Sequence, residues 1–287
     1  MRLRDANLHN QCLEVIKNAS DIPSEIKQYC VHEEKDGKSI YLDAYIPFIG
    51  NRYGQAAKAL FYCTAQNLSD RNAIVRKEYA DNPELAIKRL CLKKPGTLHI
   101  DVGPISGGVL PALAGLVLYL ENNLFEEDLT NVLEYIAVTN FYKFSLWNTE
   151  RKDLNPDRLE ESLRDRYDRF MLENYIKHEI EILKPDYIFI FGKTRHMLLK
   201  KYLEEKNPLI KLFRINDTAW LLRGGGWKKE PSVLDNKVNM LIESYCRYIR
   251  TRSEMKDPHF YAAYGKRVKQ IESYLRHYYF EIVRNFQ

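Results

Sequence analysis

The chain has 287 residues, of which 45% are hydrophobic and 29% are charged. This composition is ordinary for a folded globular protein, and it excludes a largely disordered or fibrous chain. The longest apolar run, 109–120, has twelve residues, whereas a helix that spans a bilayer needs about 20. The basic residues at the start of the chain are not followed by an apolar stretch. We therefore expect no secretory signal, no membrane partner and a cytoplasmic location.

The cysteines and histidines give no sign of a metal site. The five cysteines are scattered, and none has the spacing of about two to four residues that metal and iron–sulfur sites use. The seven histidines show neither ligand spacing nor a partnered nucleophile, which disfavours a zinc hydrolase or a serine hydrolase. We expect reduced, structural cysteines, no metal and no cofactor.

The positive charge of the chain is concentrated near its end. The formal net charge is +5, from 44 basic and 39 acidic residues. Between Lys237 and Gln287 there are ten basic and five acidic residues, an excess of five. The rest of the chain is therefore close to neutral.

Short apolar segments alternate with segments of helical period. The segment 158–183 follows Asn155-Pro156-Asp157 and stops at Lys184-Pro185, which predicts a helix. The segment 186–191 has five apolar residues out of six and predicts a strand buried on both faces. Together the alternating segments predict an α/β fold, a three-layer α/β/α sandwich with a mainly parallel central sheet. The five expected strands are 57–63, 97–102, 134–138, 186–191 and 211–215.

Three regions are expected along the chain. The first, 1–44, is a helical lead-in that contains a helix at 8–18. Its alternating stretch 39–45 either pairs as a strand or leads into the next region. The α/β/α domain follows at 45–230. A basic, tyrosine-rich extension at 231–287 is expected to contain two helices, 233–251 and 258–286.

Asparagines follow three of the expected strands. Asn67, Asn140 and Asn216 come four, two and one residues after the ends of apolar segments, and ligands of open α/β sheets bind at the carboxyl ends of the strands. An asparagine offers one acceptor and two donors, which suits reading the edge of a base or holding a water molecule. We expect the three side chains to converge on one cleft. The alternative is that each caps a helix or a turn.

Four features together point to a known family. The segment 46–54 lies just before a strand, and the loop 65–69 follows that strand with Asn67 near its centre. Asn140 follows a second apolar strand, and 183–194 combines the end of an acidic helix, Lys-Pro, an apolar strand and Gly-Lys. In these features the chain resembles the uracil-DNA glycosylase superfamily, over roughly 45–223.

The resemblance implies an α/β/α fold and hydrolysis of the N-glycosidic bond of a base that is flipped out of the nucleic acid. It implies that Asn67 orients the attacking water and that Asn140 recognises the base edge. It places Asn216 and Thr218 where members of the family carry their last motif. Phe141 or Tyr142 then supplies an aromatic wall, unless the two rings pack in the core. The candidate catalytic residues are Asn67 and Asn216, and the candidate base-binding residues are Gln66, Asn140, Phe141 and Thr218.

Departures from the family pattern leave other functions open. No proline or second glycine follows Asn67, and Asp217 stands where proline is usual, so that its carboxylate would repel a phosphate. The alternative is therefore a catalytically silent module of the same fold that recognises a nucleic acid or nucleotide. A third option, an enzyme acting on nucleosides or nucleotides, is supported only by the glycine-containing loop 103–108, which precedes an apolar helix. The spacing of that loop fits a plain turn better than a phosphate-binding motif.

The basic segments near the end of the chain are candidates for binding DNA or a nucleotide. Three glycines at 224–226 are flanked by cations and by Trp227, and the extension mixes cations with tyrosines. Cationic grooves with aromatic platforms bind single strands, although helix packing also explains many of the tyrosines. The candidate nucleic-acid-binding residues are Arg223, Lys228, Lys229, Arg247, Arg250, Lys266 and Arg267.

Overall fold

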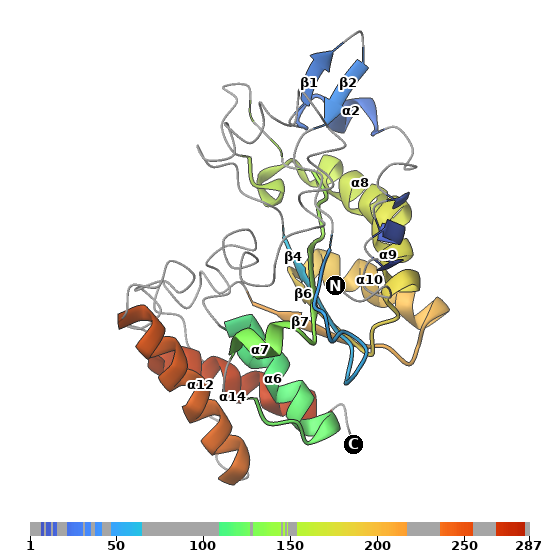
Figure 1. Ribbon diagram of the computed structural model, residues 1–287. Coiled ribbons are helices and arrows are strands. Elements are labelled where there is room, and N and C mark those ends of the chain that lie inside the picture. The colour runs from blue at the N-terminus through green and yellow to red at the C-terminus, as the bar shows by residue number, and fades with distance from the viewer. Residues whose placement is uncertain are drawn as a thin grey trace.

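The described part of the chain forms an α/β fold (Figure 1). Its centre is a five-stranded, mainly parallel sheet, and helices cover both faces of this sheet. The expected α/β class is confirmed, and the arrangement is compatible with a three-layer sandwich. The computed structural model describes residues 7–8, 10–12, 14–15, 22–30, 32–35, 38–41, 47–64, 109–126, 129–144, 146, 148, 154–216, 236–254 and 268–284.

The central strand of the sheet is β4, which pairs in parallel with β5 on one side and with β6 on the other. Strand β7 extends the sheet in parallel beyond β6, and the short β3 pairs antiparallel with β5. All residues of β4, β5 and β6 are buried, as expected for strands covered on both faces. In sheet order, the strands are β3 (Phe48–Ile49), β5 (Ala137–Asn140), β4 (Ala59–Cys63), β6 (Tyr187–Phe191) and β7 (Lys211–Ile215).

The strand expected at 134–138 begins later, at Ala137. The reason is a short helix, α7 (Leu129–Leu133), that runs directly into it. The backbone N–H groups of Glu134 and Tyr135 donate to carbonyls of this helix, so these residues complete the helical end instead of joining the sheet. Of the other expected strands, 57–63, 186–191 and 211–215 match β4, β6 and β7, while 97–102 lies outside the described residues.

One face of the sheet is covered by α6 (Val109–Asn122), α7, α12 (Asn236–Glu254) and α14 (Val268–Arg284) (Figure 1). Under them the rings of Phe61, Phe189 and Phe213 form a stack across three neighbouring strands, with centroids 4.7 and 5.1 Å apart. The helices α12 and α14 belong to the expected C-terminal extension. Tyr245 and Tyr274 on them are fully buried in the same core. These tyrosines are packing residues.

A glycine brings α12 close to α6. A Cβ atom at Gly115 of α6 would lie only 2.0 Å from Oη of Tyr245. The tyrosine ring therefore occupies the space that a side chain at position 115 would need.

The other face is covered by α2 (Ser24–Lys27), α8 (Glu161–Met171), α9 (Lys177–Leu183) and α10 (Lys193–Lys206). The helix expected at 158–183 is present, but it starts at Glu161 after the 3₁₀ turn η2 (Pro156–Arg158). A π-helical turn, η3 (Leu172–Ile176), joins α8 to α9. As the Lys-Pro pair predicts, the helix ends at Lys184, which has a left-handed φ of 46°.

Residues 39–41 of the alternating stretch 39–45 pair as part of a strand, while 42–45 lie outside the described residues. Residues His32–Lys35 (β1) and Lys38–Tyr41 (β2) form an antiparallel two-stranded sheet, separate from the central one (Figure 1).

A buried ion pair ties the segment after β5 to α9. Lys143 Nζ lies 2.6 Å from Glu179 Oε1, and both side chains are almost fully buried. Lys143 also donates to Thr139 Oγ1 at 2.7 Å, and Tyr62 Oη donates to the second oxygen of Glu179 at 3.3 Å. Burial lowers the pKa of Lys143 and raises the pKa of Glu179, whereas their attraction opposes both shifts. The pair is thus closed, with each partner satisfied by the other and by a hydroxyl.

The variant Lys143→Met should lower the free energy of unfolding by about 3–5 kcal/mol, because it leaves the Glu179 carboxylate buried without a cation. The double variant Lys143→Met/Glu179→Gln should recover much of this loss, since it removes the stranded charge. Urea unfolding of the wild type, both single variants and the double variant measures the coupling. Additive losses in the double variant would contradict a coupled ion pair.

Candidate functional site

The order of the strands marks one edge of the sheet as a candidate ligand site. Strand β5 lies on one side of β4, and the next strand along the chain, β6, lies on the other side. The carboxyl ends of β4 and β6 therefore form a topological switch point, where α/β proteins bind their ligands. Thr64 directly follows β4 at this point, and Gly192 directly follows β6.

A buried arginine lies at the switch point. Arg195 is in the first turn of α10, and only 4% of it is exposed. Its Nε donates to the carbonyl of Phe191 at 2.9 Å, and its Nη1 donates to Asp157 Oδ1 at 2.5 Å and to Tyr142 Oη at 3.3 Å. Its Nη2 makes only long contacts, 3.4 Å to Thr64 Oγ1 and 3.5 Å to Asp157 Oδ2. The guanidinium thus joins the last residue of β6 to groups that come after β4 and β5 in the chain.

Glycine at position 192 makes room for the guanidinium. Gly192 has a φ of 91°, and a Cβ atom there would lie 2.4 Å from Nη2 of Arg195. Another residue at this position would therefore be strained and would also push the arginine away.

Behind the arginine lies a buried carboxyl group. Tyr142 Oη donates to Asp168 Oδ1 at 2.5 Å, while Asp168 Oδ2 is buried and has no hydrogen-bond partner within the described part of the chain. Burial raises the pKa of Asp168 to about 6; the hydrogen bond from Tyr142 and the charge of Arg195 oppose this rise. Burial also raises the pKa of Tyr142, which stays a neutral phenol that passes a hydrogen bond from Arg195 to Asp168.

The outer member of this group is Asp157. Its side chain is 48% exposed, whereas that of Arg195 is 4% exposed. It lies in η2, and its backbone N–H donates to the side chain of Asn155 at 2.9 Å. We refer to Thr64, Tyr142, Asp157, Asp168 and Arg195 as the Arg195 cluster.

Two of the expected site residues lie at the same edge of the sheet, but not next to each other. Asn140 ends β5 and is 4% exposed, opposite Cys63 of β4. Asn216 follows β7, and its backbone donates to Tyr278 Oη at 2.7 Å and accepts from Tyr274 Oη at 3.0 Å. Strands β5 and β7 are three strand spacings apart, or about 14 Å. The described structure therefore does not bring these two asparagines together.

The aromatic residues after β5 are held in the core. Phe141 is fully buried, and its ring makes edge-to-face contacts with Tyr62 and Tyr142 at centroid distances of 6.4 and 5.4 Å. Tyr142 in turn stacks on Tyr167 at 4.8 Å. Neither ring offers an exposed wall for a base: Phe141 serves packing, and Tyr142 takes part in the Arg195 cluster through its hydroxyl group while its ring packs in the core.

The remaining expected site residues fall into two groups. Arg247 and Arg250 are exposed on α12. The others lie outside the described residues: Gln66, Asn67, Thr218, Arg223, Lys228, Lys229, Lys266 and Arg267.

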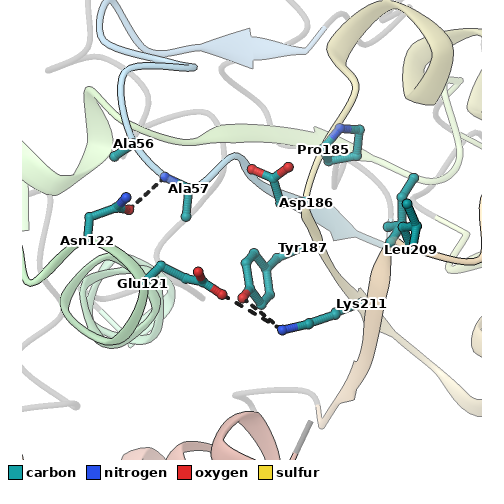
Figure 2. Close-up of a pocket in the computed structure, with 10 residues that line it drawn as sticks. Ala56, Ala57, Glu121, Asn122, Pro185, Asp186, Tyr187, Leu209 and Lys211 are labelled. Carbon is teal, nitrogen blue, oxygen red and sulfur yellow. Dashed lines mark hydrogen bonds and ion pairs between the residues drawn. The ribbon is translucent and has the colours of Figure 1, made fainter. Parts of the chain in front are cut away.

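A pocket at the opposite edge of the sheet has different chemistry. It has a volume of about 420 Å³ and lies at the amino ends of β6 and β7 (Figure 2). Lys211 Nζ lies 3.4 Å from Tyr187 Oη and 3.8 Å from Glu121 Oε1. Asn122 accepts a hydrogen bond from the backbone of Ala57 at 2.8 Å. The cation of this pocket is thus already balanced, and the pocket lies away from the switch point.

Comparisons with known proteins do not identify the chain. No protein-family model matches it, and no curated protein is significantly similar to it. Within the described ranges, no helix is long and apolar enough to cross a membrane. Over the same ranges, no three histidine, cysteine, aspartate or glutamate side chains gather into a possible metal site.

Replacement of Asp168 should change how stability depends on pH. Its pKa of about 6 exceeds the ordinary value of 3.8, so the folded state binds this proton more tightly than the unfolded state does. As the pH rises from about 4 to 7, the wild type should lose up to about 3 kcal/mol of stability relative to Asp168→Asn, which cannot titrate. Urea unfolding of both proteins across this pH range checks the prediction. Parallel stability curves would show that the carboxyl group has an ordinary pKa.

Proposed function

We propose that the protein binds a nucleic acid or nucleotide at the carboxyl edge of its sheet and hydrolyses the N-glycosidic bond of a flipped base. The observation that carries the proposal is the buried guanidinium of Arg195 at the switch point between β4 and β6. A uracil-DNA-glycosylase-like version of the α/β/α fold is part of this proposal, and it rests on the sequence resemblance.

The amino end of α10 supports the binding of phosphate. Lys193 and Thr194 are exposed in its first turn, which contains no acidic residue, and Gly192 supplies no side-chain cap. The free N–H groups at the start of a helix carry partial positive charge, and anions bind there. The two cations of this turn, Lys193 and Arg195, interact unfavourably with the positive end of the helix dipole. Their charges become favourable when an anion is bound there.

The arrangement of β4 and β5 supports a role for the two asparagines that the resemblance singles out. Cys63, the last residue of β4, is paired with Asn140, the last residue of β5. In the sequence Asn67 comes four residues after Cys63, whereas Asn140 is itself the last residue of the adjacent strand. In the proposed reaction Asn140 reads the base edge and Asn67 orients water towards the sugar. Because an asparagine is not a general base, we expect slow hydrolysis driven by departure of the base as an anion. Asn216 has no role in the proposed reaction, because β7 lies three strand spacings from β5.

Strand scission after alkali treatment tests the proposed activity. The substrates are single- and double-stranded oligonucleotides that carry uracil, hypoxanthine or mismatched thymine. The variant Asn67→Ala should lower the rate at least about 100-fold, as loss of one positioned catalytic group does elsewhere. The matched control Asn236→Ala removes an exposed asparagine from α12 and should leave the rate unchanged.

The second candidate function is a catalytically silent recognition module of the same fold. It is favoured by the sequence that follows Asn67, where the residues of a tight turn are missing. Binding of the same oligonucleotides, with no scission for any base, would establish this function in place of hydrolysis.

The exposed cations of α12 should contribute to nucleic-acid binding. If Arg247 and Arg250 contact phosphates, the variant Arg247→Gln/Arg250→Gln should flatten the plot of log affinity against log salt by up to about 1.8, since each duplex phosphate contact contributes about 0.9. The control Lys201→Gln/Lys206→Gln removes the same charge from exposed positions of α10. Fluorescence anisotropy with a labelled duplex gives both slopes. Equal slopes for the two variants would remove these arginines from the interface.

A further inference from the structure

We infer that Arg195 binds an oxyanion of the phosphate class, and that Asp157 occupies the position of this oxyanion when no ligand is bound. The inference rests on the proposed function in one respect, that the ligand is a phosphate-bearing nucleotide or nucleic acid. It adds the residue that binds the phosphate and the carboxylate that competes with it.

A buried guanidinium requires an anion, and the carboxylate that contacts Arg195 directly, Asp157, lies at the protein surface, while the buried Asp168 is reached only through Tyr142. Arg195 is 4% exposed, whereas its counter-ion Asp157 is 48% exposed. An unpaired buried charge is strongly destabilising, so the site selects for a negative group at this position. A carboxylate that is half in solvent meets this need at low cost, and a ligand can reach the place where it lies.

The guanidinium does not depend on Asp157 for its position. Its Nε is fixed by the carbonyl of Phe191, and Nη1 also donates to Tyr142. Gly192 makes space for Nη2. The carbonyl of Phe191 and the hydroxyl of Tyr142 are buried groups. They therefore keep the guanidinium oriented when the Asp157 side chain turns away from it.

The contact between the two side chains leaves hydrogen-bonding capacity unused. Asp157 makes one short bond, 2.5 Å to Nη1, while its second oxygen lies 3.5 Å from Nη2. Thr64 Oγ1 lies 3.4 Å from the same Nη2. A tetrahedral oxyanion has more acceptor oxygens than a carboxylate, and it can bind both terminal nitrogens of an arginine at once.

Asp157 can turn away without unfolding its surroundings. Its backbone N–H donates to the side chain of Asn155, and the neighbouring Pro156 is buried. Rotation of the Asp157 side chain alone therefore uncovers Nη1 of Arg195. The exposed Lys193 at the start of α10 adds positive charge on the same turn of helix.

The test compares two variants that remove one negative charge each. Asp157→Asn uncovers Arg195 electrostatically, while Glu173→Gln removes the carboxylate from an exposed ion pair with Lys177 on the neighbouring helical turn. The probes are inorganic phosphate and 2-deoxyribose 5-phosphate, titrated calorimetrically at constant ionic strength. Asp157→Asn should bind both about tenfold more tightly than the wild type, the gain from one additional charged hydrogen bond. Glu173→Gln should bind like the wild type.

A second substitution assigns the gain to the arginine. Adding Arg195→Gln to Asp157→Asn should abolish the increase, and Asp157→Ser should reproduce it with a smaller side chain. Equal phosphate affinity in Asp157→Asn and Glu173→Gln would overturn the inference. Failure of both Asp157 variants to fold would also overturn it, because the carboxylate would then be a structural element and not a replaceable occupant.

The outcome is separable from that of the glycosylase assay. Tighter phosphate binding by Asp157→Asn, without strand scission by any form of the protein, would support this site and reject the hydrolytic function. Scission with no effect of Asp157→Asn on phosphate affinity would do the reverse.

Discussion

The stack of Phe61, Phe189 and Phe213 runs across three strands that are covered on that face by α6, α12 and α14. The opposite face of β4 and β6 is covered by α8, α9 and α10, and all residues of these two strands are buried, whereas Arg214 of β7 is exposed. A strand that is buried on both faces has no room for an uncompensated polar side chain along its length. Along β4 and β6, side chains that need a polar partner or solvent are therefore confined to the strand ends. Thr64, Tyr142 and Arg195 accordingly lie together at the switch point, beyond the carboxyl ends of the strands. Lys211 lies at the opposite edge, at the amino end of β7.

Two polar networks start from neighbouring residues after β5, and they differ in how they end. The network of Lys143 closes on Glu179 inside the protein, where each partner is satisfied. The network of Tyr142 continues through Arg195 to Asp157, which is half exposed, and it leaves one oxygen of Asp168 without a described partner. A closed network fixes the fold, whereas an open one has capacity left for a ligand. This difference is why the Arg195 cluster, and not the buried ion pair, is the candidate site.

The sequence predicted the elements of the fold better than the site. The apolar segments at 186–191 and 211–215, and the long helix ended by Lys-Pro, depend on local patterns that hydrophobic periodicity detects. The start of β5 was misplaced because the apolar residues after Leu133 fit a helical end as well as a strand. The expectation that the asparagines meet failed for Asn140 and Asn216, because strand order, which local sequence does not encode, separates them.

The Arg195 cluster was missed for a related reason. Its contacts join Thr64 to Arg195 and Tyr142 to Asp168, pairs that are far apart in the sequence. Two local signals were available. Asn155-Pro156-Asp157 predicts the start of a helix, and Gly192 belongs to the motif that resembles the glycosylase family; neither pattern alone reveals the contact with Arg195. An arginine in the first turn of a helix, where acidic residues are usual, is the further signal that points to an anion.

The final helix also has a mechanical role. Tyr274 and Tyr278 of α14 bind both polar groups of the Asn216 backbone, at the end of β7, the outermost parallel strand of the sheet in the described part of the chain. A strand at the margin of a sheet has a neighbour on one side only, so its end frays easily. By binding the end of β7, α14 stabilises the pairing of this edge strand with β6. Removing α14 would therefore loosen the end of β7 first. The switch point between β4 and β6 would be affected only afterwards.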